Sequence, residues 1–488
     1  MKVIDMPPFA PVLMESTRAM GYSLEAAVAD IIDNSIAAVA DEIDLYFSPY
    51  DASPYVAILD NGMGMDGAKI NDAMRYGSQS SLAVRDAKDL GRFGLGLKTA
   101  SLSQCKCLTV ISKQPGSLEA RRWDLDEIAK KGSWALLSLS KRDIEAIPQY
   151  KEYLKKMKQG TLVIWENLDR MLKGAKATDQ LMNKNMDYVR EHLSLVFHRY
   201  LSGESEINKI TIRMNGLAIE PKDPFLKSKS TIFQDDEKFI IDGKIVRVSS
   251  YMLPHVNYLT KKEKDSLGGI DGLRKNQGFY VYRNKRLLVW GTWFRMHRKD
   301  ELSKLARICV DLPNSLDHLW TLDIRKSTAI PPDIIKSNLS RIVDRISEGS
   351  KRTWTFRGKR EISDKGTNLW SKLLSREGVV YNLNREHIFL KLLEDTLDKK
   401  QKKLLEDYLK LAEENLPLNQ LYVDLNNEEQ INYKKDKEIE ADAMKKAKLI
   451  LSNIADSPNK NEIIEAVIST DPFCRFRKIV AMLTKEME

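Results

Sequence analysis

The stretch at residues 89–103 reads DLGRFGLGLKTASLS. Three glycines, Gly91, Gly94 and Gly96, precede a predicted helix that begins near Leu97. Such a loop exposes backbone N–H groups at the positive end of a helix dipole, which is an arrangement that binds phosphates, and Lys98 adds a positive charge. No GKS or GKT ends the loop, so it is not a P-loop, and no βαβ unit surrounds it as a Rossmann fold would require. By itself the stretch indicates phosphate binding and leaves the fold open.

An amphipathic helix is predicted upstream, from Leu24 onward, with Ser23 as its N-cap. Asp30 and Asn34 lie four residues apart, which places a carboxylate and a carboxamide one turn apart on the same face. Pairs of this kind are usually a solvated helix face. The surrounding AVADIIDNSIAAV is too apolar for this face to be open to water along its whole length, so we expect something polar opposite it.

Two strand ends complete the pattern. The run YVAILDNGMGMD ends a buried-type strand in Asp60, followed by Gly62 and Gly64. A carboxylate there can accept a hydrogen bond from an exocyclic amine, and glycines let the backbone approach a flat ring closely, although a plain turn would read the same way. Gly160 and Thr161 open a later strand, TLVIWENLD, where the threonine hydroxyl could join the hydrogen bonds of Asp60 directly or through water. Each element alone is a weak signal, but the four in this order are hard to obtain by chance.

Together these stretches resemble the four motifs of the GHKL superfamily of ATPases (gyrase, chaperone, histidine kinase and MutL), over roughly residues 15–170. GRFGLGLKTAS and GTLVIWENLD are most similar to MORC-like ATPases and their prokaryotic relatives, with MutL-like proteins next. The resemblance implies an α/β fold, in which a Bergerat α/β sandwich binds ATP between its sheet and a mobile lid at residues 75–90. It also implies a Mg²⁺-dependent ATPase that forms a homodimer when ATP orders the lid and an N-terminal strap at residues 1–17.

The same resemblance assigns the site residues. Asp60 would contact adenine, Asn34 would bind Mg²⁺, and the glycine loop would hold the phosphates. The family usually has a glutamate as the catalytic base, where this chain has Asp30, so we expect slow hydrolysis, and a nucleotide sensor with little hydrolysis stays open. The residues expected to bind ATP are Asn34, Asp60, Asn61, Gly62, Gly64, Met65, Gly77, Ser78, Gly91, Arg92, Phe93, Gly94, Leu95, Gly96, Leu97, Lys98 and Thr161.

Three domains are expected: an ATP-binding domain at 1–205, an α+β domain at 206–345 and a charged helical domain at 346–488. The middle domain resembles the superfamily's transducer through RMNGLAIEPKDPF, QGFYVYRNKRLLVW and LDIRKSTAIPP. In relatives a transducer lysine reaches the γ-phosphate. Lys326 is the candidate for this catalytic role here, with Lys285 as a second choice.

The segment Gly272–Lys299 combines basic and aromatic residues and contains no Asp or Glu. This composition suits a phosphate backbone, so we expect double-stranded DNA as a partner. A strand pair with core aromatics and solvent-facing charges is the alternative. A second basic stretch at Lys351–Arg360 favours DNA. The residues expected to bind DNA are Arg274, Lys275, Arg283, Lys285, Arg286, Arg295, Arg298 and Lys299.

The net charge, the cysteine count and the hydropathy of the whole sequence limit the remaining possibilities. The 488 residues carry a formal net charge of +9, which favours polyanionic partners. Cys105 and Cys107, two of only four cysteines, have no second Cys or His pair nearby, which argues against a zinc site and a disulfide framework. No apolar run is long enough to span a membrane, and we expect a cytoplasmic protein.

Two hypotheses for the function compete. The first is an ATP-gated clamp on DNA, in a prokaryotic antiviral defence or DNA-processing system with a partner nuclease or helicase. A chaperone-like ATPase acting on protein clients is the alternative. A histidine kinase would need a phosphoacceptor histidine before the ATP domain, and no histidine precedes His192.

Overall fold

The computed structural model of the chain divides into two compact units, Met1–Thr355 and Phe356–Glu488. The residues it describes are 6, 8–19, 21–50, 53–77, 96–172, 178–204, 207–254, 258–300, 303–316, 321–322, 329–332, 336–343, 369–375, 378–385, 387–417, 436–454, 460–470 and 473–487.

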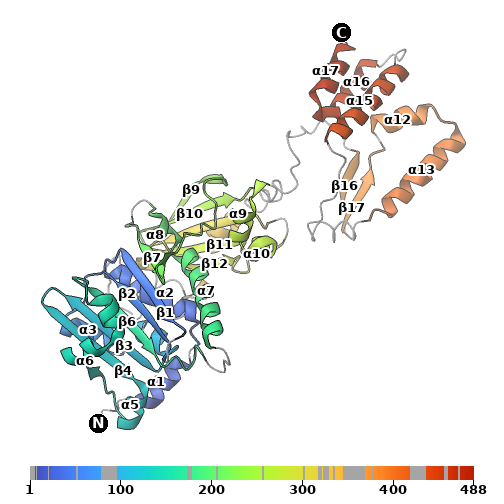
Figure 1. Cartoon of the computed structure of the whole chain (residues 1–488). Coiled ribbons are helices and arrows are strands. Elements are labelled where there is room, and N and C mark those ends of the chain that lie inside the picture. Colours follow the sequence, from blue (N-terminus) through green and yellow to red (C-terminus); the bar gives the residue numbers. More distant parts are fainter. Residues whose placement is uncertain are drawn as a thin grey trace. The chain divides into compact units, whose positions relative to one another are not determined.

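The first sheet of the first unit has the strand order β5-β4-β3-β6-β2-β1-β7-β8 (Figure 1). Neighbouring strands are antiparallel except β1 and β7, which are parallel. The strands are β1 (Glu42–Ser48), β2 (Tyr55–Asp60), β3 (Cys107–Gln114), β4 (Ser117–Asp124), β5 (Leu137–Ser138), β6 (Gly160–Glu166), β7 (Thr211–Met214) and β8 (Leu217–Ala218). The two strands predicted to end in Asp60 and to open at Gly160 are β2 and β6.

Helices cover both faces of this sheet, because its central strands are apolar on both sides. All six side chains of β2 are buried. Val56 and Ile58 join the core beneath α2 and α7, whereas Ala57 and Leu59 pack with Ile144 on the opposite face. The helices are α1 (Ala10–Arg18), α2 (Leu24–Ala37), α3 (Gly67–Met74), α4 (Gly96–Leu102), α5 (Leu125–Lys131), α6 (Lys141–Ala146), the π-helix η1 (Tyr150–Leu154), α7 (Thr178–Val196) and α8 (His198–Ser202). This layered arrangement confirms the predicted α/β class.

A second, smaller sheet follows in the order β12-β11-β13-β10-β9. Strands β11 and β13 are parallel and the other pairs are antiparallel. Phe279 and Trp293 lie in its own hydrophobic core. The elements are β9 (Thr231–Ile241), β10 (Lys244–Met252), α9 (Lys261–Ser266), α10 (Gly269–Lys275), β11 (Gly278–Arg283), β12 (Arg286–Thr292), β13 (Ala306–Leu312), the 3-10 helix η3 (Asn314–Leu316), and the short pair β14 (Thr321–Leu322) and β15 (Ala329–Ile330).

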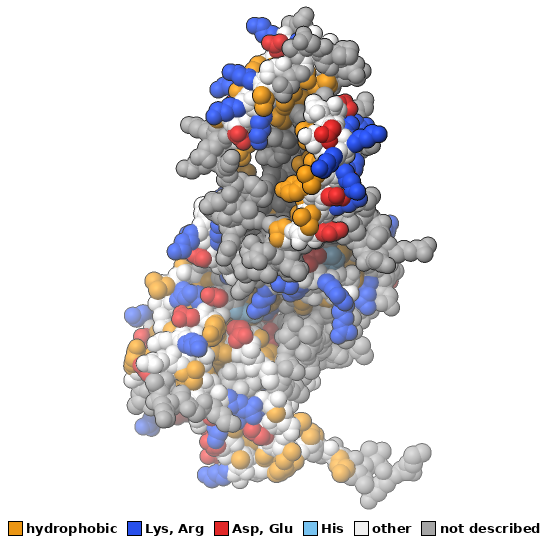
Figure 2. Space-filling view, turned by 90° about the vertical axis from the view of Figure 1, so that its right-hand side faces the viewer, with side chains coloured by type: hydrophobic (Ala, Val, Ile, Leu, Met, Phe, Trp, Pro, Cys, Tyr) orange, Lys and Arg blue, Asp and Glu red, His pale blue; other side chains and the backbone are white. Residues whose placement is uncertain are grey.

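The second unit begins with a strand pair that the sequence did not predict, β16 (Trp370–Ser375) and β17 (Gly378–Leu383). The helices that follow are α12 (Ile388–Asp395), α13 (Lys399–Glu414), α15 (Asp436–Asn453), α16 (Lys460–Ser469), the 3-10 turn η4 (Phe473–Arg475) and α17 (Arg477–Lys485). The hydrophobic side chains Leu404, Tyr408 and Leu411 of α13 are exposed. Figure 2 shows hydrophobic side chains of this unit lying open among basic and acidic ones.

Candidate active site

Helix α2 presents the first two candidate residues on one face. The helix begins where predicted, and the Ser23 hydroxyl accepts a hydrogen bond from the Ala26 N–H at 3.4 Å, which caps its first turn. The apolar side of the helix packs into the core of the first sheet. Asp30 is only 7% exposed, whereas Asn34, one turn later, is exposed. Since residues four apart lie on the same face of a helix, the carboxylate sits deeper in the site and the carboxamide nearer its mouth.

Two groups fix the surroundings of Asp30. The Tyr22 hydroxyl donates a hydrogen bond to Asp30 Oδ2 at 3.1 Å. A Cβ built on Gly96 would lie 3.6 Å from the same oxygen, so the first residue of α4 comes next to the carboxylate. The end of the glycine-rich stretch and the candidate base are therefore neighbours in space, although 66 positions separate Asp30 and Gly96 in the chain. No described residue is recorded as hydrogen-bonding the Asn34 carboxamide, which is open to a ligand.

Asp60, at the end of β2, is the most completely held polar side chain of the site. Its Oδ1 accepts the N–H groups of Gly62 at 2.9 Å and of Thr161 at 3.3 Å, and its Oδ2 accepts the Ser35 hydroxyl at 2.9 Å. Burial raises the pKa of the Asp60 carboxyl, and these three hydrogen bonds lower it in part. A carboxylate offers about four acceptor positions. One position on Oδ2 remains for an amine donor, as the exocyclic amine of adenine would provide.

Strands β3 and β6 carry a second polar layer beside Asp60. The Ser112 and Thr161 hydroxyl groups are 3.0 Å apart, and Ser112 Oγ also accepts the Met65 N–H at 2.7 Å. Asp60 thus receives the amide of Thr161, whereas the sequence prediction used its hydroxyl. The Thr161 hydroxyl instead hydrogen-bonds Ser112, whose oxygen holds the turn after β2 against β3.

The turn after β2 is shaped by residues without room for a side chain. A Cβ on Gly62 would lie 2.8 Å from the Ala38 carbonyl oxygen, and one on Gly64, whose φ is +67°, would lie 2.3 Å from the Lys113 carbonyl oxygen. The Asn61 side chain turns toward the start of β1, where Oδ1 accepts the Asp41 and Glu42 N–H groups, each at 3.1 Å. Asn61 therefore fixes the turn after β2 to the start of β1.

Part of the expected phosphate loop and lid lies outside the described residues, namely Ser78, Gly91, Arg92, Phe93, Gly94 and Leu95, and so does Lys326. Gly77 has a φ of +71°, and no atom of the described residues lies within 4 Å of the position that a Cβ would take there. Leu97 packs against the core of the first sheet, and Lys98 is buried, with Nζ donating to the Ala73 carbonyl at 2.9 Å. Burial lowers the pKa of Lys98 from 10.5 to about 8. In this structure Lys98 ties α4 to the end of α3.

The family model that describes histidine kinase-, DNA gyrase B- and HSP90-like ATPases matches residues 22–161. Residues 22–161 form a GHKL-type ATPase domain. The match begins at Tyr22, which contacts Asp30, and ends at Thr161, which contacts Asp60. A search of curated proteins finds no match to the chain. The GHKL family binds ATP, and the acceptor position left on Asp60, the open carboxamide of Asn34 and the glycine at Asp30 fit such a ligand.

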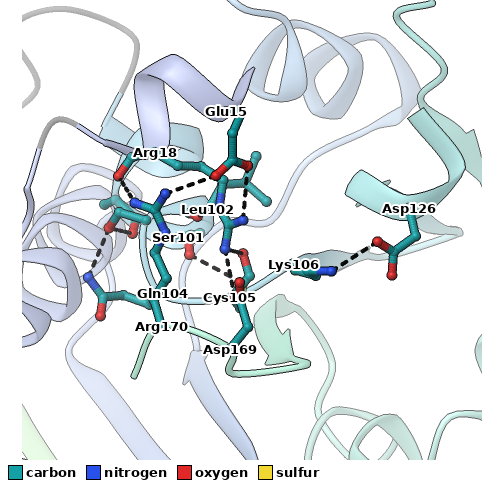
Figure 3. A network of polar contacts seen from close by, with 12 residues as sticks. Glu15, Arg18, Ser101, Leu102, Gln104, Cys105, Lys106, Asp126, Asp169 and Arg170 are labelled. Carbon is teal, nitrogen blue, oxygen red and sulfur yellow. Dashed lines mark hydrogen bonds and ion pairs between the residues drawn. The ribbon is translucent and has the colours of Figure 1, made fainter. Parts of the chain in front are cut away.

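Helix α1 is held against the GHKL domain by a buried arginine (Figure 3). Arg18 Nε donates to the Leu102 carbonyl at 2.6 Å and Nη2 to the Cys105 carbonyl at 3.4 Å, so the guanidinium caps the C-terminal end of α4. The same guanidinium pairs with Asp169 at 2.6 Å and with Glu15 at 3.2 Å. Positive charge at a helix C-terminus is stabilising, so Arg18 links α1 to the helix that follows the glycine loop.

Two arginines expected on a DNA-binding surface lie inside the protein, which corrects that expectation. Arg283 and Arg286 are 5% and 4% exposed. They face each other across the β11–β12 hairpin, whose turn residues Asn284 and Lys285 have φ values of 47° and 67°. Arg286 Nε lies 3.3 Å from Asp33 Oδ1 on α2. Asp33, the residue before Asn34 on α2, is thus paired with the second sheet.

The other expected DNA contacts divide by exposure. Lys285 is half-buried, with Nζ 3.9 Å from Asp311. The side chains that remain exposed are Arg274, Lys275, Arg295, Arg298 and Lys299. Lys299 Nζ donates to the Lys275 carbonyl, so the end of α10 and the segment after β12 lie together. The aromatics Phe279, Tyr280, Tyr282 and Trp293 are core residues and are not available for stacking.

No helix among the described residues is long and apolar enough to cross a bilayer. The described residues also contain no group of three or more His, Cys, Asp or Glu side chains that could hold a metal.

Proposed function

We propose that the chain is a Mg²⁺-dependent ATPase with Asp30 as its catalytic base. The observation that carries this proposal is the juxtaposition of Asp30, Asn34 and the start of α4, with Asp60 hydrogen-bonded to Ser35 on the same helix α2. Asp60 would accept the adenine amine, and Asn34 would hold Mg²⁺. Bound Mg²⁺ supplies charge neutralisation on the phosphates.

Asp30 would take the proton of the attacking water as its oxygen bonds to the γ-phosphorus and the bond to ADP breaks. The Tyr22 hydroxyl orients the Asp30 carboxylate through its hydrogen bond to Oδ2. An aspartate reaches one methylene less far than the glutamate usual in the family, so turnover should be slow. The Lys326 contact with the γ-phosphate belongs to the same proposal.

ATP-dependent homodimerisation is the second part of the proposal. Order–disorder transitions of lids and straps couple nucleotide state to assembly in many switches. Helix α1, which overlaps the expected strap, contacts α4, and α4 follows the glycine loop. Movement of the strap would therefore be transmitted to the phosphate site through α4. The three-domain division, with a transducer at 206–345, fits this scheme.

DNA is the proposed substrate of the clamp, within a prokaryotic defence or DNA-processing system that includes a nuclease or helicase. Support comes from the net charge of +9 and from the exposed cluster of Arg274, Lys275, Arg298 and Lys299. Phosphate contacts by Lys and Arg give affinity that falls steeply with salt. A chaperone-like action on proteins is the second candidate, and the exposed Leu404, Tyr408 and Leu411 of α13 favour it.

Phosphate release with and without duplex DNA tests the proposal and separates its two candidates. DNA should stimulate the wild type, and R274Q/K275Q should lower DNA affinity and flatten the slope of log affinity against log salt by up to about 2, since each phosphate contact accounts for about 0.9. K261Q/K262Q on α9 removes the same charge from exposed positions outside the cluster and should behave as wild type. Stimulation by unfolded protein but not by DNA would select the chaperone-like candidate. Release of no phosphate at all would leave a nucleotide sensor.

A further inference from the structure

Arg286 reaches from the second sheet to the nucleotide helix. It is the first residue of β12, and its Nε lies 3.3 Å from Asp33 Oδ1 in the middle of α2, 253 positions earlier in the chain. Both side chains are at most 5% exposed. A buried carboxylate without a partner is costly, so Asp33 and Arg286 depend on one another.

Aromatic and imidazole groups enclose this pair. The Arg286 guanidinium lies over the Phe197 ring at 5.4 Å, and its Nη1 donates to the Leu287 carbonyl at 2.6 Å. His192 on α7 packs against Trp290 on β12, with ring centroids 5.7 Å apart. Burial and the Arg286 charge lower the pKa of His192 to about 3, so this histidine is neutral and adds no competing positive charge.

The position of Asp33 gives the pair its importance. Asp33 immediately precedes Asn34, the proposed Mg²⁺ ligand, and neighbouring residues on a helix point about 100° apart. Asn34 can therefore face the ligand while Asp33 faces the second sheet. A shift of β12 that moved Arg286 would pull on the turn of α2 that carries Asn34.

We infer that Arg286 is a positioning residue that acts through Asp33 to hold Asn34 in place, so that occupancy of the nucleotide site and the position of β12 are coupled. This inference rests on the proposed use of ATP with Mg²⁺. Coupling between two sites is reciprocal and commonly amounts to about 5- to 150-fold in affinity. Arg286 thus serves the nucleotide site from inside the second sheet rather than DNA from its surface.

The test compares two buried arginines that join the same two regions. Arg199 on α8 pairs with Asp311 on β13 at 2.6 Å, and none of its recorded contacts is with α2. R286Q should raise the Kd of ATP about tenfold in Mg²⁺ and less than threefold in EDTA. R199Q should lower the free energy of unfolding comparably and leave the Mg²⁺-dependent part of ATP affinity unchanged. The double variant D33N/R286Q, which replaces the ion pair by two amides, should recover part of the lost affinity.

Three results decide the matter. Equal changes in ATP affinity for R286Q and R199Q, or an unchanged Mg²⁺ dependence in R286Q, would overturn the inference and leave the proposed ATPase intact. Failure of the wild type to bind ATP in Mg²⁺ would instead remove the proposed function. If R286Q does not fold, R286K and R199K carry the same comparison, with a smaller loss of Mg²⁺-dependent affinity expected only for R286K.

Discussion

Replacing Arg18 by methionine should loosen α1 from the GHKL domain and lower the free energy of unfolding by about 3 kcal/mol. Methionine keeps much of the length and apolar stem of the side chain but removes its donors. The Leu102 carbonyl, 2.6 Å from Nε, would lose a charged donor that is 3% exposed. A hydrogen bond of this kind contributes about 1.5–3 kcal/mol.

The remaining contacts of Arg18 are worth less. Asp169 is 29% exposed, so solvent screening limits that ion pair to about 1 kcal/mol. Glu15 is 62% exposed, so its pair should contribute nothing measurable. Urea denaturation followed by circular dichroism measures the total, and limited proteolysis reports whether α1 has detached.

Two matched variants sharpen this prediction. D169N removes only the acidic partner and should cost about 1 kcal/mol or less. R18K keeps the charge but not the branched donor set and should lie between wild type and R18M. A change below about 0.5 kcal/mol for R18M, within the range of an ordinary surface substitution, would refute the assignment of Arg18 as the link between α1 and α4.

The remaining predictions concern Lys98 and Asp30. Because burial lowers the pKa of Lys98 from 10.5 to about 8, the unfolded chain binds more protons between these values, and wild type should gain stability relative to K98M as the pH rises from 8 to 10. Urea midpoints that differ by a constant amount over this range would contradict it. D30N should lower the phosphate-release rate by about 100-fold or more while leaving the Kd of ATP within threefold, since it removes a base but keeps an acceptor for Tyr22. Normal turnover in D30N would transfer the role of base to another group.

Local sequence patterns predicted the parts of the site that depend on local structure. The capped helix α2 follows from its periodicity, and Asp60 and the glycines follow from the end of a buried strand. The hydrogen bonds that hold Asp60 come from Ser35 and Thr161, on two other elements, so only the fold brings them together. No local pattern pointed to Ser35 as a partner of Asp60.

Arg286 shows where pattern reasoning fails. Alternation along β12 would place Arg286, its one charged residue, in solvent if nothing packed on that face. Here α2, Phe197 and the hairpin enclose the guanidinium, and its partner Asp33 is 253 positions away. Arg18 is a similar case, since its acceptors at Leu102 and Asp169 are 84 and 151 positions away. Contacts between residues this far apart in the chain leave no periodic pattern in the local sequence.

The most direct measurement is the Kd of ATP for wild type and D60N, taken together with their free energies of unfolding. Asparagine can keep the acceptor for Gly62 and Thr161 and turn its amide toward the Ser35 hydroxyl. Because burial raises the pKa of the Asp60 carboxyl, its charge lowers the free energy of unfolding at pH values above its unfolded pKa, so D60N, which lacks this charge, should be at least as stable as wild type. The same amide would face the adenine amine donor to donor, and ATP affinity should fall about 100-fold. A D60N protein that is folded and binds ATP as tightly as wild type would contradict the placement of the nucleotide at Asp60.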